Sequence, residues 1–255
     1  LCNFACVYCG PNFSSKWSSE LEIYPQTPMD DQLENFKKYI FSNASKLKHV
    51  YLAGGEPLLM KQNLELLELL LNVNPEVNLR INTNLSNTDT KIFETVCKFN
   101  NVHWTVSVET MEEEFEYIRY GGSWNDFVTN LTTIRELDHK ITFNMLHFLL
   151  NYMSVFKCVD WLQSLGFHPN SFVIGSLLNP DYLNIRHLPE TTLKQVEEEI
   201  QQRLSQKQGY LLDDSYRNML HYINTPATKT LQDSFEQLAK LDQRRNLDSK
   251  KIFTS

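Results

Sequence analysis

The feature that most constrains the fold is a regular alternation of short apolar stretches with helical patterns. Five stretches rich in β-branched and aromatic residues occupy positions 49–53, 78–82, 103–108, 141–146 and 172–175. Between them, apolar residues recur three or four positions apart, which is the period of an amphipathic helix. Ser123 is placed to cap one such helix and Gly166 to end another. This alternation predicts parallel βα units, with functional loops at the carboxyl ends of the strands.

The pattern changes after about residue 185, where no further strand is indicated. Leu193, Val196, Ile200 and Leu204 predict a long amphipathic helix, and Pro189 suits its first turn. Two more helical segments are expected over 214–223 and 228–244. We therefore predict two domains, an α/β domain over 1–180 and a helical accessory region over 181–255.

Composition and charge exclude several classes of protein. The chain has 255 residues, with 42% hydrophobic and 22% charged residues, which is ordinary for a globular protein. Its net charge is −7 and no basic stripe is present, so we expect no nucleic-acid partner. No apolar run is long enough for a membrane helix. The chain starts at Leu1 rather than Met, so we expect the native start to lie upstream.

Three of the five cysteines, Cys2, Cys6 and Cys9, are crowded into one short segment. A [4Fe–4S] cluster is normally held by four cysteines, and three would leave one iron open, as in a catalytic metal site. A zinc site with a distant fourth ligand and three ordinary thiols are the alternatives. Cys97 and Cys158 lie in apolar helical patterns, so we expect them to be buried and structural. Such cysteine usage fits a reduced, cytoplasmic protein.

A second motif, Gly54-Gly55-Glu56-Pro57, follows the first apolar stretch. It predicts a loop at the carboxyl end of a strand. The two glycines permit close backbone approach to a ligand, and Glu56 offers a carboxylate to an ammonium group. The alternative is a simple turn with a solvated glutamate.

Together, the cysteine triplet, Tyr8 before its last cysteine and the Gly-Gly-Glu-Pro loop resemble the radical S-adenosylmethionine (SAM) superfamily. The resemblance covers roughly residues 1–180. It implies a partial (β/α)6 TIM-type barrel whose first strand precedes the cysteine loop. That strand is then expected before Leu1, with strands two to six present here.

The same resemblance implies the chemistry. Cys2, Cys6 and Cys9 would hold a [4Fe–4S] cluster whose open iron chelates the amino and carboxylate groups of SAM. A reductant such as flavodoxin or ferredoxin would drive SAM cleavage to a 5′-deoxyadenosyl radical. The cofactor-binding residues it implies are Tyr8, Gly54, Gly55, Glu56, Pro57, Asn84, Ser107, Glu109, Arg119 and Asn151.

Several of these positions have other interpretations. Asn84 lies in Thr-Asn-Leu, where the family often has Thr-Asn-Gly, and could simply form a turn. Ser107 and Glu109 are expected near the ribose and Arg119 near the methionine carboxylate, although Arg119 could be a solvated helix residue. Asn151 could bond the cofactor or cap the next helix.

The expected function is the radical modification of a peptide or protein. The accessory region resembles the twitch domain of such enzymes, but no cysteine follows Cys158, which puts an auxiliary cluster in doubt. The alternatives are a radical SAM enzyme of small-molecule or cofactor biosynthesis, a barrel that binds SAM without turnover, and a non-enzymatic zinc-binding module.

Overall fold

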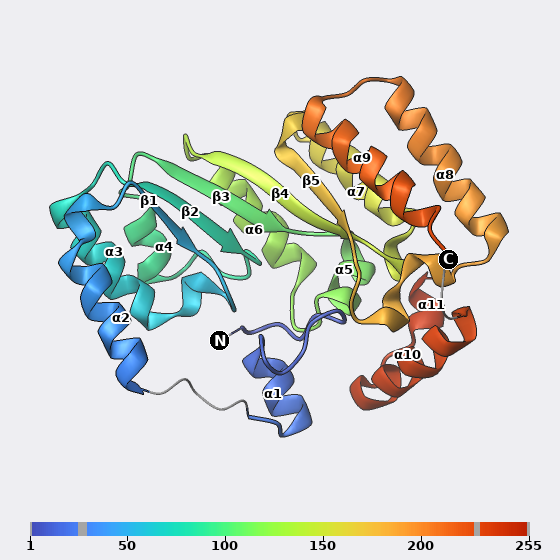
Figure 1. Cartoon of the computed structure of the whole chain (residues 1–255), viewed down its shortest axis with the longest axis horizontal. Coiled ribbons are helices and arrows are strands. Elements are labelled where there is room, and N and C mark those ends of the chain that lie inside the picture. Colours follow the sequence, from blue (N-terminus) through green and yellow to red (C-terminus); the bar gives the residue numbers. More distant parts are fainter. Residues whose placement is uncertain (1, 25–29, 227–229, 254–255) are drawn as a thin grey trace. The chain divides into compact units, whose positions relative to one another are not determined.

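The computed structural model describes residues 2–24, 30–226 and 230–253, with side chains described from residue 34 in the second range (Figure 1). The chain forms two compact units. Unit 1 comprises Leu1–Ser107 and Gly121–Ile141, and unit 2 comprises Val108–Tyr120 and Thr142–Ser255. This division differs from the boundary near residue 180 that the sequence suggests, so that boundary stays a prediction.

Five strands form one open sheet, in the order β1-β2-β3-β4-β5. Their bounds are β1 (His49–Leu52), β2 (Asn78–Thr83), β3 (Val102–Ser107), β4 (Lys140–His147) and β5 (Phe172–Ser176). The pairs β1/β2, β2/β3 and β4/β5 are parallel. All five predicted strands are therefore confirmed, as is the α/β class with parallel strands of a partial TIM-type barrel.

The helices of unit 1 precede and connect its strands. They are α1 (Ser15–Leu21), α2 (Asp30–Ser42), α3 (Lys61–Val73), α4 (Lys91–Val96) and α6 (Trp124–Arg135), joined by the 3-10 turns η1 (Ala44–Lys46) and η2 (Pro57–Leu59). Leu67 and Leu70 of α3 are fully buried, as are Ile81 and Trp104 of the strands. Ser123 caps α6, as predicted, because its hydroxyl accepts a hydrogen bond from the amide of Asp126.

Unit 2 contains most of the carboxyl-terminal half of the chain. Its helices are α5 (Glu112–Ile118), α7 (Ser154–Ser164), α8 (Glu190–Ser205), α9 (Tyr210–Ile223), α10 (Leu231–Arg245) and α11 (Ser249–Phe253), with 3-10 turns η3 (Leu149–Asn151), η4 (Pro169–Ser171), η5 (Asp181–Leu183) and η6 (Ile185–His187). Gly166 follows α7 with a φ of +93°, as expected for a residue that ends a helix.

Two details of the helical prediction need correction. Pro189 occupies the N-cap of α8 rather than its first helical position. The segment predicted over 228–244 begins among residues outside the described ranges, and its described helix starts at Leu231.

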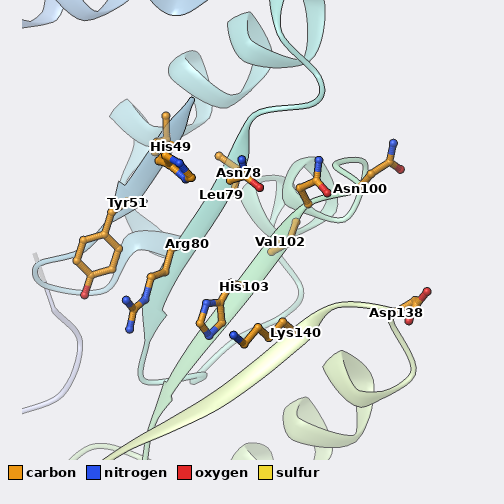
Figure 2. A pocket seen from close by; sticks show the side chains of 12 residues that line it. His49, Tyr51, Asn78, Leu79, Arg80, Asn100, Val102, His103, Asp138 and Lys140 are labelled. Carbon is orange, nitrogen blue, oxygen red and sulfur yellow. The ribbon is translucent and has the colours of Figure 1, made fainter. Parts of the chain in front are cut away.

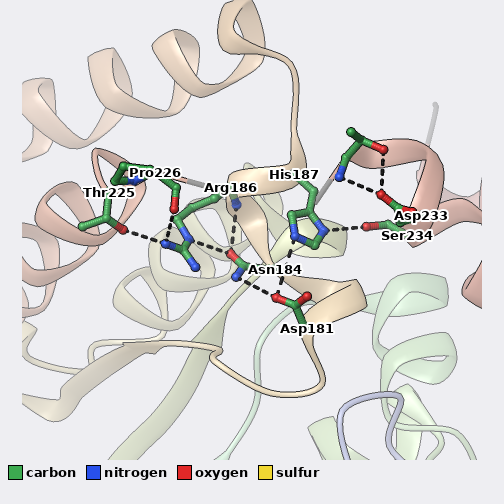
Figure 3. Close-up of polar contacts among 9 residues, drawn as sticks. Asp181, Asn184, Arg186, His187, Thr225, Pro226, Asp233 and Ser234 are labelled. Carbon is green, nitrogen blue, oxygen red and sulfur yellow. Dashed lines mark hydrogen bonds and ion pairs between the residues drawn. The ribbon is translucent and has the colours of Figure 1, made fainter. Parts of the chain in front are cut away.

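A polar row within unit 2 joins the η5–η6 segment to α10 (Figure 3). The buried His187 places Nδ1 2.9 Å from the hydroxyl of Ser234 and Nε2 3.8 Å from the carboxylate of Asp181. Beside it, Arg186 donates to the Thr225 hydroxyl at 2.9 Å and to the Pro226 carbonyl at 2.8 Å. Ser234 is fully buried, and through it the row connects the η5–η6 segment to α10.

Candidate functional site

The cysteine loop precedes α1 in unit 1. The amide of Cys9 donates to the carbonyl of Cys6 at 2.9 Å, which closes a turn between the last two cysteines. Cys6 is buried, Cys2 and Cys9 are half-buried, and none of the three forms a disulfide. Tyr8, which lies between Cys6 and Cys9 in the sequence, is also half-buried.

Helix α1 fixes the backbone of this loop. Its Ser15 donates to the carbonyl of Cys2 at 2.8 Å, and the indole of Trp17 donates to the carbonyl of Cys6 at 2.8 Å. Ser14 caps the helix and donates to the carbonyl of Phe4. Sequence reasoning missed α1 because its segment is rich in serine and lacks an apolar stripe. A single tryptophan amid serines was the one available signal.

The Gly-Gly-Glu-Pro loop follows β1 and closes on the end of β2. Gly54 and Gly55 have φ of +83° and +55°, in the left-handed region that favours glycine. Open space surrounds the position that a Cβ of Gly54 would take. The positive φ angles therefore explain why both positions are glycine, and there is room for another group beside Gly54.

Glu56 is 1% exposed, so it is not the solvated glutamate of the simple-turn alternative. Its Oε1 accepts from the Leu58 amide at 3.1 Å and from the Thr83 hydroxyl at 2.8 Å. Its Oε2 accepts from the Asn84 amide at 2.7 Å. Two of these three donors belong to the end of β2, so the carboxylate holds the loop against that strand. Pro57 begins the turn η2 directly after it.

Asn84 links β2 to the cysteine loop. Its side-chain amide donates to Oδ1 of Asn3 at 3.0 Å and lies 3.8 Å from Sγ of Cys2. Its own Oδ1 accepts from the Ser86 amide at 2.9 Å. The next residue, Leu85, has a φ of +56°. Unit 1 thus brings together three of the predicted segments: the cysteine loop, the Gly-Gly-Glu-Pro loop and the Thr-Asn-Leu turn.

In unit 2, Glu109 and Arg119 pair with each other. Nε and Nη2 of Arg119 each donate to one oxygen of Glu109, both at 2.7 Å. The side chain of Arg119 is 4% exposed and that of Glu109 is 2% exposed, so Arg119 is not a solvated helix residue. Such a bidentate pair fixes both groups in orientation. Sequence reasoning named both residues but did not anticipate that they pair.

Asn151 is fully buried at the turn after β4. Its Oδ1 accepts from the Phe148 amide at 2.8 Å, and its amide donates to the Leu146 carbonyl at 2.7 Å. A longer contact of 3.4 Å reaches the Glu109 carbonyl. Asn151 therefore caps the turn η3 rather than the helix α7. Ser107, in contrast, is half-buried at the last position of β3.

The two cysteines outside the loop, Cys97 and Cys158, both have raised pKa values. Burial raises the pKa of the Cys158 thiol well above its usual value, and the nearby Glu109 carboxylate acts in the same direction. Burial also raises the pKa of Cys97, which is half-buried rather than buried as predicted. Thiols with raised pKa values are poor metal ligands, because the thiolate is the ligating form.

The donor set of the loop suits a cluster held by three cysteines. In the part of the chain that the structure describes, no three His, Cys, Asp or Glu side chains converge tightly enough to hold a single metal ion. A cluster takes one thiolate at each of several irons, so its ligands stand farther apart than those of one ion. Cys2, Cys6 and Cys9 are the residues that would hold it.

None of the helices among the described residues is both long and apolar enough to span a membrane.

Comparison with solved structures reveals the same fold in longer proteins. The chain superposes on anSMEcpe with bound AdoMet (TM-score 0.57, 16% identity), covering 84% of this chain and 60% of that one. It also superposes on Streptococcus suis SuiB bound to precursor peptide SuiA (TM-score 0.56, 15% identity), covering 86% of this chain and 49% of that one. The chain thus spans about half to three-fifths of these proteins. At such identities, the likeness shows the fold alone.

Comparison with curated proteins gives no match. The family model of the radical SAM superfamily matches residues 1–162, which is more than half of the chain and includes the cysteine loop and the Gly-Gly-Glu-Pro loop. Members of this family are enzymes that use a [4Fe–4S] cluster and SAM. The chain belongs to the radical SAM superfamily.

Proposed function

We propose that this chain reductively cleaves SAM at a [4Fe–4S] cluster held by Cys2, Cys6 and Cys9, and that it thereby modifies a peptide or protein substrate. The observation that carries the proposal is the set of contacts within unit 1 that runs from Glu56 through Asn84 to Cys2. These contacts connect the Gly-Gly-Glu-Pro loop to the cysteine loop. When bound, the cluster and SAM supply electron transfer to the sulfonium and a carbon radical that abstracts hydrogen.

The loop after β1 is the proposed recognition element for the amino group of SAM. Gly54 and Gly55 are exposed, with open space beside Gly54, and the carboxylate of the buried Glu56 follows them directly. An ammonium group is favoured next to such a charge. Tyr8, in the cysteine loop, and Pro57, directly after Glu56, are further proposed cofactor-binding residues.

In unit 2, we assign Glu109 to the ribose hydroxyls and Arg119 to the methionine carboxylate. Ser107 and Asn151 are further proposed cofactor-binding residues. The bidentate pair supports this assignment in part, because it fixes the orientation of Glu109. Arg119 then acts both as a partner of Glu109 and as a source of positive charge.

The peptide substrate is suggested by the structural neighbours. One of them is anSMEcpe with bound AdoMet and a Cp18Cys peptide, and another is SuiB bound to precursor peptide SuiA. Both are proteins with this fold in complex with a peptide. For this chain we accordingly propose a peptide or protein substrate, a flavodoxin or ferredoxin as reductant and a cytoplasmic location.

The test is anaerobic reconstitution with iron and sulfide, followed by addition of SAM and dithionite. About four irons and four sulfides per chain are expected from cubane stoichiometry. 5′-Deoxyadenosine and methionine should form slowly without substrate. Cys6→Ala should abolish both the cluster and the products, whereas the matched variant Cys97→Ala should retain them.

Two outcomes would overturn the proposal. A colourless protein that retains zinc instead of iron would favour the zinc-binding module. An intact cluster that binds SAM but yields no 5′-deoxyadenosine under strong reductant would favour a barrel without turnover.

A further inference from the structure

One face of β1, β2 and β3 is polar, which is unusual for parallel strands. Parallel sheets are normally covered on both faces, and their strands are then apolar throughout. Here β1 and β2 alternate strictly between exposed and buried residues along their first four positions. The apolar half packs under the helices, and the polar half borders open space.

The strand register places the polar side chains in a row. Tyr51 of β1 is opposite Arg80 of β2, and Arg80 is opposite His103 of β3. Lys140, the first residue of β4, continues the row. Figure 2 shows these four side chains side by side across the strands. They line a cavity of about 570 Å³ within unit 1. That volume is in the range of small-molecule and peptide side-chain sites.

The cavity carries two cations without carboxylate partners. Among the described residues, neither Arg80 nor Lys140 lies in an ion pair, and the one carboxylate in the lining belongs to Asp138. Burial, together with the charges of Lys140 and Arg80, lowers the pKa of His103 to about 4. His103 is therefore neutral at pH 7, chiefly because it is partly buried, and the two nearby cations act in the same direction.

The guanidinium of Arg80 is held in place by its neighbours. Its Nε donates to the Thr105 hydroxyl at 3.0 Å, and its central carbon lies 5.4 Å from the centre of the Tyr51 ring. Neither contact uses the two terminal nitrogens. A guanidinium fixed in this way presents a planar pair of donors, which matches the two oxygens of a carboxylate.

We propose that the Arg80 pocket, formed by Tyr51, Arg80, His103 and Lys140, binds a carboxylate group of an acidic peptide segment. The inference deepens the proposed function, because it specifies which peptides the enzyme accepts. The pocket lies toward the amino ends of the strands, whereas Glu56 and Asn84 follow their carboxyl ends. Arg80 and Asn84 are four residues apart, or about 13 Å along an extended strand. An acidic residue bound here would anchor the peptide several residues away from the reacting position.

The overall charge favours a peptide over a nucleic acid. The chain carries a net charge of −7, so its general field opposes any polyanion, and binding of an acidic group here depends on the two local cations. Two local cations suit one or two carboxylates, and they fall far short of the basic surface on which nucleic-acid binding depends.

The test measures binding of a fluorescein-labelled peptide of alternating glycine and glutamate to the reconstituted full chain, by fluorescence anisotropy at low salt. The control peptide has glutamine in place of glutamate. We expect the acidic peptide to bind at least about tenfold more tightly, which corresponds to one charge-assisted hydrogen bond. Arg80→Gln should remove most of this preference. Arg135→Gln, which changes an exposed arginine of α6 in the same unit, should preserve it.

A second variant tests the same inference if Arg80→Gln does not fold. Lys140 is exposed, so Lys140→Gln should fold normally and lower the affinity for the acidic peptide about threefold to tenfold. Equal affinity for the two peptides, or equal effects of Arg80→Gln and Arg135→Gln, would overturn the inference. So would tighter binding of an oligothymidylate than of the acidic peptide.

The two proposals can fail separately. Wild-type protein that cleaves SAM but binds both peptides equally would contradict only the Arg80 pocket. Protein that prefers the acidic peptide but assembles no cluster would contradict only the proposed function.

Discussion

At the scale of single residues, Asn84 has the clearest connection to the proposed chemistry. Its side-chain amide lies 3.8 Å from Sγ of Cys2, a distance at which an N–H group still bonds weakly to sulfur. Hydrogen bonds to cluster sulfurs are one of the factors that set reduction potentials. A donor stabilises the more negative, reduced state and raises the potential.

We therefore expect Asn84→Ala to make the cluster potential more negative by about 20–40 mV. This is a weak hydrogen bond of about 0.5–1 kcal/mol, converted at 59 mV per tenfold change for one electron. A redox titration followed by electron paramagnetic resonance gives the value directly. Asn74→Ala, which removes an asparagine that bonds to the carbonyls of Ala44 and Leu47, is the control and should not move it. Equal potentials in Asn84→Ala and wild type would exclude the role.

The next residue, Leu85, has a backbone conformation that favours glycine but a side chain that fills a buried site. Its φ of +56° suits glycine, which the family often has at this position, but its side chain is fully buried. A left-handed conformation costs a residue with a Cβ about 1–2 kcal/mol. The burial of a leucine contributes more than that, which explains why this chain tolerates the strain.

This conflict predicts an inverted order of stability. Leu85→Ala and Leu85→Gly should both lower the free energy of unfolding by about 2–4 kcal/mol, because each empties a buried site. The glycine variant should nevertheless be the more stable of the two by about 1 kcal/mol, since it alone relieves the backbone. At Leu79, inside β2, the usual order with alanine ahead of glycine should hold. Urea unfolding of the four variants decides it, and the same order at both positions would contradict the argument.

Residue types and spacing predicted much of the candidate site but not its contacts. The cysteine triplet and the Gly-Gly-Glu-Pro loop are local signals, so the sequence reveals them directly. That Glu56 accepts from Thr83 and Asn84 depends on which strand lies next to β1, which no local pattern encodes. The pairing of Glu109 with Arg119 likewise depends on how the two ends of the segment that holds α5 meet within unit 2.

At the scale of elements, the edge of β5 is closed by a helix. β5 is the last strand of the sheet, and α9 lies along it (Figure 1). The buried amide of Ile174 donates to the hydroxyl of Ser215 on α9 at 3.0 Å, and Ser215 donates to the Leu211 carbonyl. A side chain thus accepts the hydrogen bond that another strand would accept, which protects the edge from pairing with other chains.

Ser215→Ala should therefore leave the Ile174 amide without an acceptor. A buried donor without a partner costs about 1–3 kcal/mol, so the free energy of unfolding should fall by that amount. Hydrogen exchange at the Ile174 amide should also accelerate more than elsewhere in β4 and β5. Ser205→Ala, at an exposed serine of α8, is the matched control and should change neither quantity. An unaltered exchange rate at Ile174 would show that the helix does not seal the edge.

The success of the element prediction follows from periodicity. The strands and the helices α2, α3, α4, α6, α7, α8 and α9 were found because apolar residues repeat along them at the period of the element. The short helices α1, α5 and α11 were missed, whereas the equally short α4 was found because Ile92, Phe93, Val96 and Cys97 follow the helical spacing. They exist because tertiary contacts hold them. In α5, Tyr117 donates to Asp242 of α10 at 2.7 Å, and no local pattern predicts this bond.

At the scale of the whole molecule, stability should depend on pH through a buried histidine. His147, at the end of β4, is fully buried, and its Nε2 donates to the Tyr152 carbonyl at 3.1 Å. Its Nδ1 has no hydrogen-bond partner among the described residues. A proton on Nδ1 would bury a charged donor without an acceptor. Burial accordingly lowers the pKa of His147 to about 4, although its bond to Tyr152 acts in the opposite direction.

The sign of the effect follows from where the proton binds. Between pH 6.5 and about 4, the unfolded chain protonates this histidine and the folded chain does not. The free energy of unfolding should therefore fall as the pH drops through this window and be fully retained above it. From pH 7.5 to pH 5.0, the loss due to His147 should be about 2 kcal/mol.

In His147→Gln, which keeps a donor for Tyr152 but cannot titrate, urea unfolding at the two pH values should show a loss smaller by this amount. Met145→Leu, a buried and non-titrating change on the same strand, should lower stability equally at both pH values and retain the wild-type pH dependence. If His147→Gln and Met145→Leu show the same dependence on pH, the acid sensitivity originates elsewhere in the molecule.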